Sequence, residues 1–198
     1  MVSISNASIS NVEAVDVGDR ILAAAASCVR DFGVERVTVA EIARRAGVSR
    51  PTVYRRWPDT RTILASLLTQ RVTGAWRAVP ARSPGREGIV ERIVEVATVL
   101  RRDDLLLDVL RSAPELAMVY IADRLGTSQQ ILIDLVAEEL RKAQDAKSVR
   151  PGDPRQLAAM VLLITQSVIQ SGQIVEPILT AYALSVELTH ALNGYLHP

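Results

Sequence analysis

The chain has 198 residues, of which 48% are hydrophobic and 23% charged, and its formal net charge is +1. This length can bury a core without disulfides or metal ions, and the single cysteine, Cys28, excludes an intramolecular disulfide and a multi-cysteine zinc site. No apolar run approaches the roughly 20 residues that span a membrane, and no signal peptide opens the chain, so we expect a cytoplasmic protein without a membrane partner.

The charges are distributed unevenly along the chain. Residues 41–61 hold six arginines against two acidic residues, a net charge of +4, whereas residues 62–198 have a net charge of −1. This asymmetry predicts that one end of the protein binds a polyanion, although a solvated, charged helix face would show the same count.

The first elements follow from composition and periodicity. Residues 1–15 are rich in Ser, Asn and Val and are predicted to be a disordered arm. Apolar residues at helical spacing predict a first helix over residues 16–32, ended by Gly33. Cys28 lies on this apolar stripe without a nearby His, so we interpret it as a core residue and not as a nucleophile.

Two short helices are predicted over residues 38–57. Thr38 and Glu41 form the pattern of a capping box, in which each side chain bonds the other residue's backbone amide. The helix that they begin ends at Gly47, and Ser49 caps the next one, with a proline tolerated in its first turn.

The remaining chain shows helical periodicity only. Asp59 caps a longer helix, and further helices are predicted over residues 87–102, 104–111, 114–125, 128–146, 154–172 and 177–196. Because no alternating strand pattern competes, we predict an all-α fold of about nine or ten helices. An N-terminal three-helix helix-turn-helix domain would occupy residues 16–62, and a larger C-terminal helical bundle for ligand binding and dimerisation residues 63–198.

Two short helices joined by a glycine-containing turn are typical of a helix-turn-helix, whose second helix lies in the DNA major groove. At about 100° per residue, Val53 and Trp57 face inward and the arginines outward. Arg50 lies in the first turn, which points at base edges, where its guanidinium can offer paired donors to guanine.

The run from Thr38 to Asp59, TVAEIARRAGVSRPTVYRRWPD, resembles the DNA-binding domain of TetR-family repressors. This resemblance extends from the first helix into the fourth, and it implies double-stranded operator DNA as the partner. It places DNA contacts at Thr38, Arg50, Pro51, Thr52, Tyr54, Arg55 and Arg56.

The sequence departs from this family's pattern at two positions. Thr60 stands where family members commonly have a lysine that grips a phosphate, and Arg61 is the candidate substitute. Ala40 stands where some members read a base with a longer side chain, so it could contact only a thymine methyl. Arg44 completes the DNA-binding candidates, but Arg44 and Arg45 fit solvated charges equally well, and Tyr54 also fits packing.

One recognition helix covers one half-site, so a homodimer on a palindromic operator is expected. TetR-like proteins dimerise through their last two helices, predicted here over residues 154–172 and 177–196. The interface candidates are Val161, Val168, Ile178, Tyr182 and Val186. Alternatively, these apolar stripes face the core of the same chain.

The resemblance also implies a small-molecule effector in the C-terminal domain, coupled to the DNA-binding part through the helix that Asp59 begins. The candidates are Trp76, Leu106, Leu110, Met118, Tyr120, Ile121, Gln166 and Gln170. The two glutamines would either orient the effector or hydrogen-bond across the dimer interface. Few aromatics and no clustered charges favour an apolar or weakly polar effector.

The sequence lacks the motifs that are typical of the enzyme classes considered as alternatives. A carboxylate-bridged metal bundle needs Glu-x-x-His pairs on two helices, and the chain has a single such pair, Glu187 with His190. No His is placed to serve a Ser or Cys hydrolase, and His197 lacks a partner at ligand spacing. We therefore expect no catalytic residues, metal or cofactor, and predict a ligand-responsive transcriptional repressor. An all-α enzyme and a helix-turn-helix used only for protein contact are the alternatives, and an activator would carry the same residues.

Overall fold

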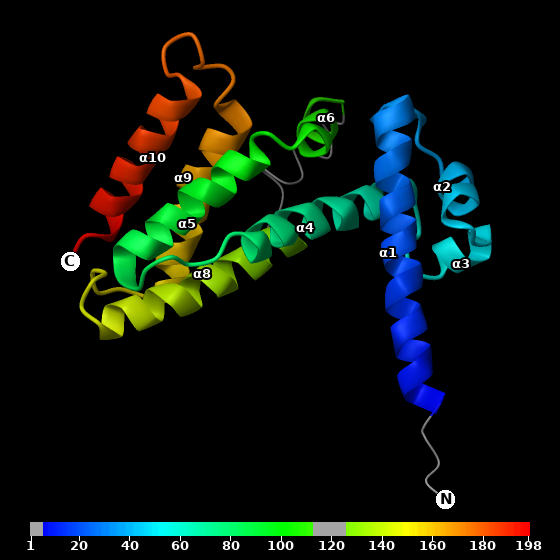
Figure 1. The fold of residues 1–198 in the computed structure, drawn as a ribbon, viewed down its shortest axis with the longest axis horizontal. Helices are drawn as coiled ribbons and strands as arrows, with labels where there is room; N and C mark the ends of the chain where they lie inside the picture. Colours follow the sequence, from blue (N-terminus) through cyan, green and yellow to red (C-terminus); the bar gives the residue numbers. More distant parts are fainter. Residues whose placement is uncertain (1–5, 113–125) are drawn as a thin grey trace, which may run out of the picture. The chain divides into compact units, whose positions relative to one another are not determined.

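The computed structural model describes the backbone of residues 6–112 and 126–198, and the side chains of these residues except 6–16 and 110. Within these ranges every regular element is a helix, which confirms the predicted all-α class (Figure 1). The elements are α1 (Asn6–Phe32), the 3-10 helix η1 (Val34–Arg36), α2 (Val39–Ala46), α3 (Arg50–Tyr54), α4 (Thr60–Ala78), α5 (Gly85–Leu100), α6 (Asp104–Ser112), α8 (Thr127–Asp145), α9 (Pro154–Ser171) and α10 (Ala181–Leu196).

The described residues divide into two compact units. Residues 6–68 and 108–112 form the first unit, and residues 69–107 and 126–198 form the second. The division lies inside α4, between Leu68 and Thr69, so this helix is shared by both units.

In the first unit, α1 packs against α2 and η1, and α2 packs against α3. The apolar stripe of α1 is buried as predicted, and burial raises the pKa of the Cys28 thiol, as suits a core residue. The fully buried side chains of this core include Ile21, Cys28, Ile42, Val53 and Ile63.

Two helices begin more than two residues away from the expected positions. The first begins at Asn6, not near residue 16, so the arm expected through residue 15 is helical from Asn6 onward. No Pro or Gly interrupts residues 6–16, and extending a helix costs less than starting one. The last begins at Ala181, because the hydroxyl of Thr180 accepts a hydrogen bond from the Ala183 amide at 3.2 Å. The helix expected over residues 114–125 lies outside the described residues.

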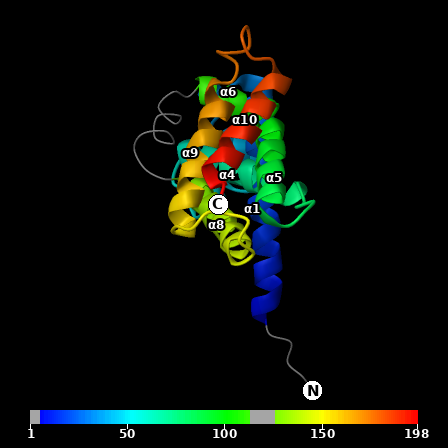
Figure 2. The same cartoon turned by 90° about the vertical axis from the view of Figure 1, so that its left-hand side faces the viewer.

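The second unit is a bundle in which α5, α9 and α10 pack against one another and α8 packs against α5 and α9 (Figure 2). Its interior is aliphatic, with Val90, Leu140, Val161, Leu192 and Leu196 at most 2% exposed. No helix in the described ranges is long and apolar enough to cross a membrane.

Arg92 on α5 binds the backbone at the C-terminal end of α4 within the second unit. Arg92 donates from Nε to the Val79 carbonyl and from Nη2 to the Trp76 carbonyl, both at 2.8 Å. Its guanidinium lies 4.0 Å from the ring centroid of Trp76 and pairs with Glu139 on α8. These bonds satisfy carbonyls that the end of the helix leaves without intrahelical partners.

Candidate nucleic-acid interface

The turn between α2 and α3 has the local geometry that the sequence predicts. Gly47 adopts a left-handed φ of 64°, which favours glycine, and ends α2. The Val48 amide donates to the Ala43 carbonyl at 3.0 Å, and the Ser49 hydroxyl accepts from the Thr52 amide at 3.2 Å. The cap at Ser49 is thereby confirmed, and α3 starts directly after a short, hydrogen-bonded turn.

The beginning of α2 confirms only half of the expected capping box. The Thr38 hydroxyl accepts from the Glu41 amide at 3.2 Å, as predicted. The carboxylate of Glu41 accepts from Arg44 at 2.6 and 2.8 Å and from Arg45 at 2.9 Å, so the prediction that it bonds the Thr38 amide is wrong. Guanidinium groups are stronger donors to a carboxylate than a backbone amide. The bonds from Arg44 and then Arg45 lower the pKa of Glu41 to about 2.

Arg45 fits neither of the interpretations left open for it. Its side chain is only 19% exposed, and Nη1 donates to Asp31 at 2.5 Å and to Ser27 at 2.6 Å, both on α1. The guanidinium also lies 4.7 Å from the ring centroid of Phe32. The bond to Asp31 and then the bond to Glu41 raise the pKa of Arg45. Arg45 therefore joins α2 to α1, whereas the neighbouring Arg44 stays 70% exposed.

The exposed face of α3 brings together four of the ten residues predicted to contact DNA. Val53 is fully buried beneath the helix, while Tyr54 is 53% exposed on the other side. The side chains of Arg50 and Arg55 make no hydrogen bond or ion pair with any other residue in the described ranges. The exposed residues of this face are Arg50, Pro51, Tyr54 and Arg55.

Two of the smaller predicted contacts, Ala40 and Thr52, are half-buried. Thr52 is half-buried, and its hydroxyl lies 2.8 Å from that of Ser49, so it belongs to the cap of α3. Thr38 is exposed at the start of α2, and Ala40 is half-buried one residue into the first turn. Their backbone amides, rather than long side chains, are what this end of α2 offers to a phosphate.

Arg56 lies against α1. A Cβ built on Gly18 would approach Nη1 of Arg56 to 2.7 Å and would lie 4.0 Å from the Trp57 ring. Trp57 itself is half-buried and donates from Nε1 to the Ser66 hydroxyl at 2.8 Å, in agreement with its predicted core role. The glycine at position 18 thus leaves room for the guanidinium of Arg56.

The start of α4 presents Arg61 to solvent. Asp59 accepts from the amide and the hydroxyl of Thr62, both at 2.7 Å, which confirms the predicted cap. The hydroxyl and then the amide of Thr62 lower the pKa of Asp59. Arg61 is exposed in the first turn of the same helix, next to Thr60.

Arg20 has a role at this site that the sequence did not indicate. From α1 its Nη2 donates to the Ala46 carbonyl at 2.5 Å and to the Gly47 carbonyl at 3.3 Å, 26 and 27 residues along the chain. The only signal in the sequence is an arginine beside the apolar stripe of α1, which is common on solvated helix faces.

In the second unit, the effector candidates that can be placed are mostly internal. Trp76 and Leu106 are 4% and 6% exposed. Gln166 is half-buried, and its side-chain oxygen accepts a hydrogen bond from Nε2 of Gln129 at 2.6 Å. The side-chain oxygen Oε1 of Gln129 accepts in turn from the Gly126 amide at 2.7 Å. Gln170 is half-buried as well, whereas Met118, Tyr120, Ile121 and the side chain of Leu110 lie outside the described residues.

The dimer candidates fall into two groups. Val161 is only 2% exposed and belongs to the chain's own core, and Val168 and Val186 are half-buried. Ile178 and Tyr182 are 86% and 81% exposed, so they are the two candidates whose side chains are available to a partner.

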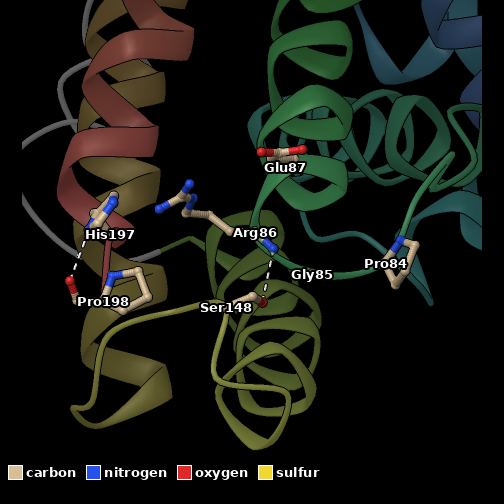
Figure 3. Close-up of a pocket in the computed structure, with 7 residues that line it drawn as sticks. All are labelled: Pro84, Gly85, Arg86, Glu87, Ser148, His197 and Pro198. Carbon is tan, nitrogen blue, oxygen red and sulfur yellow. Dashed lines mark hydrogen bonds between the residues drawn. The ribbon is translucent and has the colours of Figure 1, made fainter.

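An open pocket of about 390 Å³ lies at the start of α5 (Figure 3). The Ser148 hydroxyl accepts there from the Arg86 amide at 3.2 Å, and the ring of His197 lies close to Pro198. None of the predicted effector residues lines this pocket. The described residues also contain no group of three or more His, Cys, Asp or Glu side chains that could hold a metal ion.

Comparisons with known proteins agree with the helix-turn-helix geometry. Residues 21–67 match the family model of bacterial regulatory proteins, tetR family. An HTH-type transcriptional regulator of Mycobacterium tuberculosis is 60% identical over 196 residues, covering 99% of this chain and 100% of that protein.

Solved structures resemble the fold over nearly the whole chain. The TetR-family repressor QsdR of R. erythropolis has a TM-score of 0.68 at 19% identity and covers 92% of this chain and 96% of its own. The fatty acid degradation regulator FadR of Bacillus halodurans has a TM-score of 0.64 at 20% identity and covers 91% of this chain and 97% of its own. At these identities the likeness shows the fold alone.

Proposed function

Because the chain belongs to the TetR family of helix-turn-helix transcriptional regulators, we propose that it is a repressor that binds a palindromic operator as a homodimer and leaves it when a small-molecule effector binds. Membership of this family identifies the chain as a DNA-binding regulator and not as an enzyme. The choice of operator, the dimer and the response to an effector are the parts proposed here.

The observation that carries DNA reading is the exposed face of α3. A guanidinium without a partner in the described part of the protein, such as that of Arg50, is free to bind guanine edges or phosphates. Val53 anchors the same short helix in the core, so the base-reading side chain projects from a fixed backbone. Arg55 and the hydroxyl of Tyr54 lie on this face at positions suited to phosphate oxygens.

The dimer proposal rests on the exposed apolar side chains near the end of the chain. Ile178 and Tyr182 are large, apolar and more than 80% exposed, and water-exposed apolar patches mark interaction surfaces. In a symmetric dimer the two recognition helices would lie about 34–36 Å apart, one turn of the duplex, so each could read one half-site.

The effector proposal rests on the second unit and on α4. The aliphatic interior around Trp76 and Leu106 suits an apolar or weakly polar molecule. Since Gln166 already bonds Gln129 within the chain, this pair favours a role inside the domain over a bond across the interface. An effector that displaced the C-terminal end of α4 would act on its other end, beside Asp59, because one helix is shared by both units.

The test of DNA reading starts from duplexes that the wild-type protein selects from a random pool. We expect the association constant for a selected duplex to fall with salt, with a log–log slope of about −0.9 per phosphate contacted. If the protein binds no duplex in a salt-sensitive manner, the helix-turn-helix is a protein-contact module and the proposal is overturned.

Two substitutions on α3 test the division of labour within the site. Arg50→Ala removes a paired donor, so it should cost about 1–3 kcal/mol of discrimination between selected and unrelated duplexes. Tyr54→Phe removes one hydroxyl and should weaken binding to both duplexes by a similar factor. Equal loss of discrimination in both variants would contradict the assignment of base reading to Arg50.

A further inference from the structure

A guanidinium from α1 holds the turn of the helix-turn-helix. Nη2 of Arg20 donates to the carbonyl oxygens of Ala46 and Gly47, the last residue of α2 and the glycine that ends it. Carbonyls at a helix C-terminus lack intrahelical donors and carry partial negative charge. A cation at this position is therefore bound to the backbone of the turn itself.

The position of α3 depends on this turn. Only Val48 and Ser49 separate the left-handed Gly47 from the first residue of α3. The helix has five residues, which is too short to be stable by its own hydrogen bonds. Its direction is therefore set by the turn before it and by the burial of Val53.

Arg45 and Arg20 fasten α2 to α1 in different ways. Arg45 reaches from α2 to the side chains of Ser27 and Asp31 on α1. Arg20 reaches in the opposite direction and bonds backbone carbonyls. Loss of Arg45 would loosen the packing of two helices, whereas loss of Arg20 would free the segment that leads into the recognition helix.

We propose that Arg20 is a positioning residue for DNA recognition, which fixes the turn from Ala46 to Ser49 and so the direction of α3 without contacting DNA itself. This inference rests on the proposed function in one respect, that α3 reads DNA. Paired hydrogen bonds to a base edge require a defined direction, whereas phosphate contacts tolerate displacement. Release of the turn should therefore reduce discrimination more than it reduces affinity for unrelated DNA.

The experiment compares Arg20→Ala and Arg20→Lys with Arg30→Ala in the full chain. Arg30 is a matched control, because it is exposed on the same helix and makes no hydrogen bond or ion pair with another described residue. Dissociation constants are measured at several salt concentrations for a duplex selected by the wild-type protein and for an unrelated duplex of equal length.

We expect Arg20→Ala to lower the ratio of the two affinities about tenfold, the equivalent of one charge-assisted hydrogen bond. Its salt slope should equal that of Arg30→Ala, since neither residue contacts a phosphate. Arg20→Lys should restore part of the ratio, because an ammonium can still bond helix C-terminal carbonyls. Hydrogen exchange in the free protein should show faster exchange of the Gly47 and Val48 amides in Arg20→Ala but not in Arg30→Ala.

Two results would overturn the proposal. A salt slope weakened by about 0.9 with an unchanged affinity ratio would make Arg20 a phosphate contact. An unchanged ratio together with unchanged amide exchange would remove any positioning role. If Arg20→Ala does not fold, Arg20→Lys is tested instead, provided that its thermal unfolding midpoint equals that of the wild-type protein. The affinity ratio and the amide exchange rates are then measured for this variant. If the wild-type protein binds no duplex, the proposed function fails, while the exchange measurement still tests the hold on the turn.

Discussion

The arginines of the helix-turn-helix serve two purposes. Arg45 is bound to Asp31 and Glu41 and so acts within the protein. Arg56 lies next to Gly18 but remains exposed. Arg50 and Arg55 project from α3 without partners among the described residues. A net charge counted over the segment therefore overstates the charge available to DNA, and base reading falls chiefly to Arg50.

The carboxylate that joins Arg44 and Arg45 should make stability depend on pH in the acid range. The folded-state pKa of Glu41 is about 2, against an ordinary value of 4.5. Because the pKa is lower in the folded state, the ionised carboxylate contributes its full stabilisation at pH values above the unfolded-state pKa. This contribution is lost as the pH falls from about 4.5 towards 2. Glu41→Gln should therefore lower the thermal unfolding midpoint at neutral pH, with a difference from wild type that shrinks through this window.

The measurement is a series of thermal unfolding curves between neutral pH and pH 2. Glu35→Gln is a suitable control, since Glu35 is exposed on η1 and makes no ion pair within the described ranges. A constant difference between Glu41→Gln and wild type across the series would show that the bonds to the two arginines do not stabilise the fold.

At the scale of single elements, what lies close along the chain could be predicted and what lies far apart could not. Side-chain caps bond amides three residues away, so Thr38, Ser49 and Asp59 were recognisable from local patterns. The hydrogen bonds of Arg20 to the Ala46 and Gly47 carbonyls span 26 and 27 residues. The sequence around Arg20 does not indicate this turn, and the sequence of the turn does not indicate Arg20. The partner of Glu41 was missed because the local rule did not include competition between a backbone amide and two guanidinium groups.

The cap at the start of α4 gives a prediction at this scale. Asp59→Ala removes the acceptor for two hydrogen bonds from Thr62, so it should lower the free energy of unfolding by about 1 kcal/mol. Asp59→Asn keeps an acceptor oxygen of similar geometry and should retain most of this stability. Urea unfolding of the three proteins checks the order, and equal losses in both variants would show that the negative charge, not the cap, is what stabilises this helix end.

At the scale of the whole molecule, the division into units was harder to predict than the helices. The helix-turn-helix domain was expected to end at residue 62, and the compact unit that contains it continues to Leu68 along the same helix, α4. Periodicity locates a helix from its own residues, but the unit to which each turn belongs depends on packing partners elsewhere in the chain. The same reason explains why Val161, on an apolar stripe, was a plausible interface residue and is buried in its own core.

The exposed end of the second unit gives the prediction that concerns the assembly. Ile178→Glu together with Tyr182→Glu should dissociate the proposed dimer, because burying two carboxylates in an apolar interface costs far more than the packing returns. Val99→Glu is the control, since Val99 is a 45% exposed apolar residue on α5, outside the proposed interface. Sedimentation velocity should give a monomer for the double variant and a dimer for the control. A monomer presents one recognition helix, so the double variant should also lose most of its affinity for a full palindrome while binding a half-site as wild type does. A double variant that stays dimeric would place the interface on another surface.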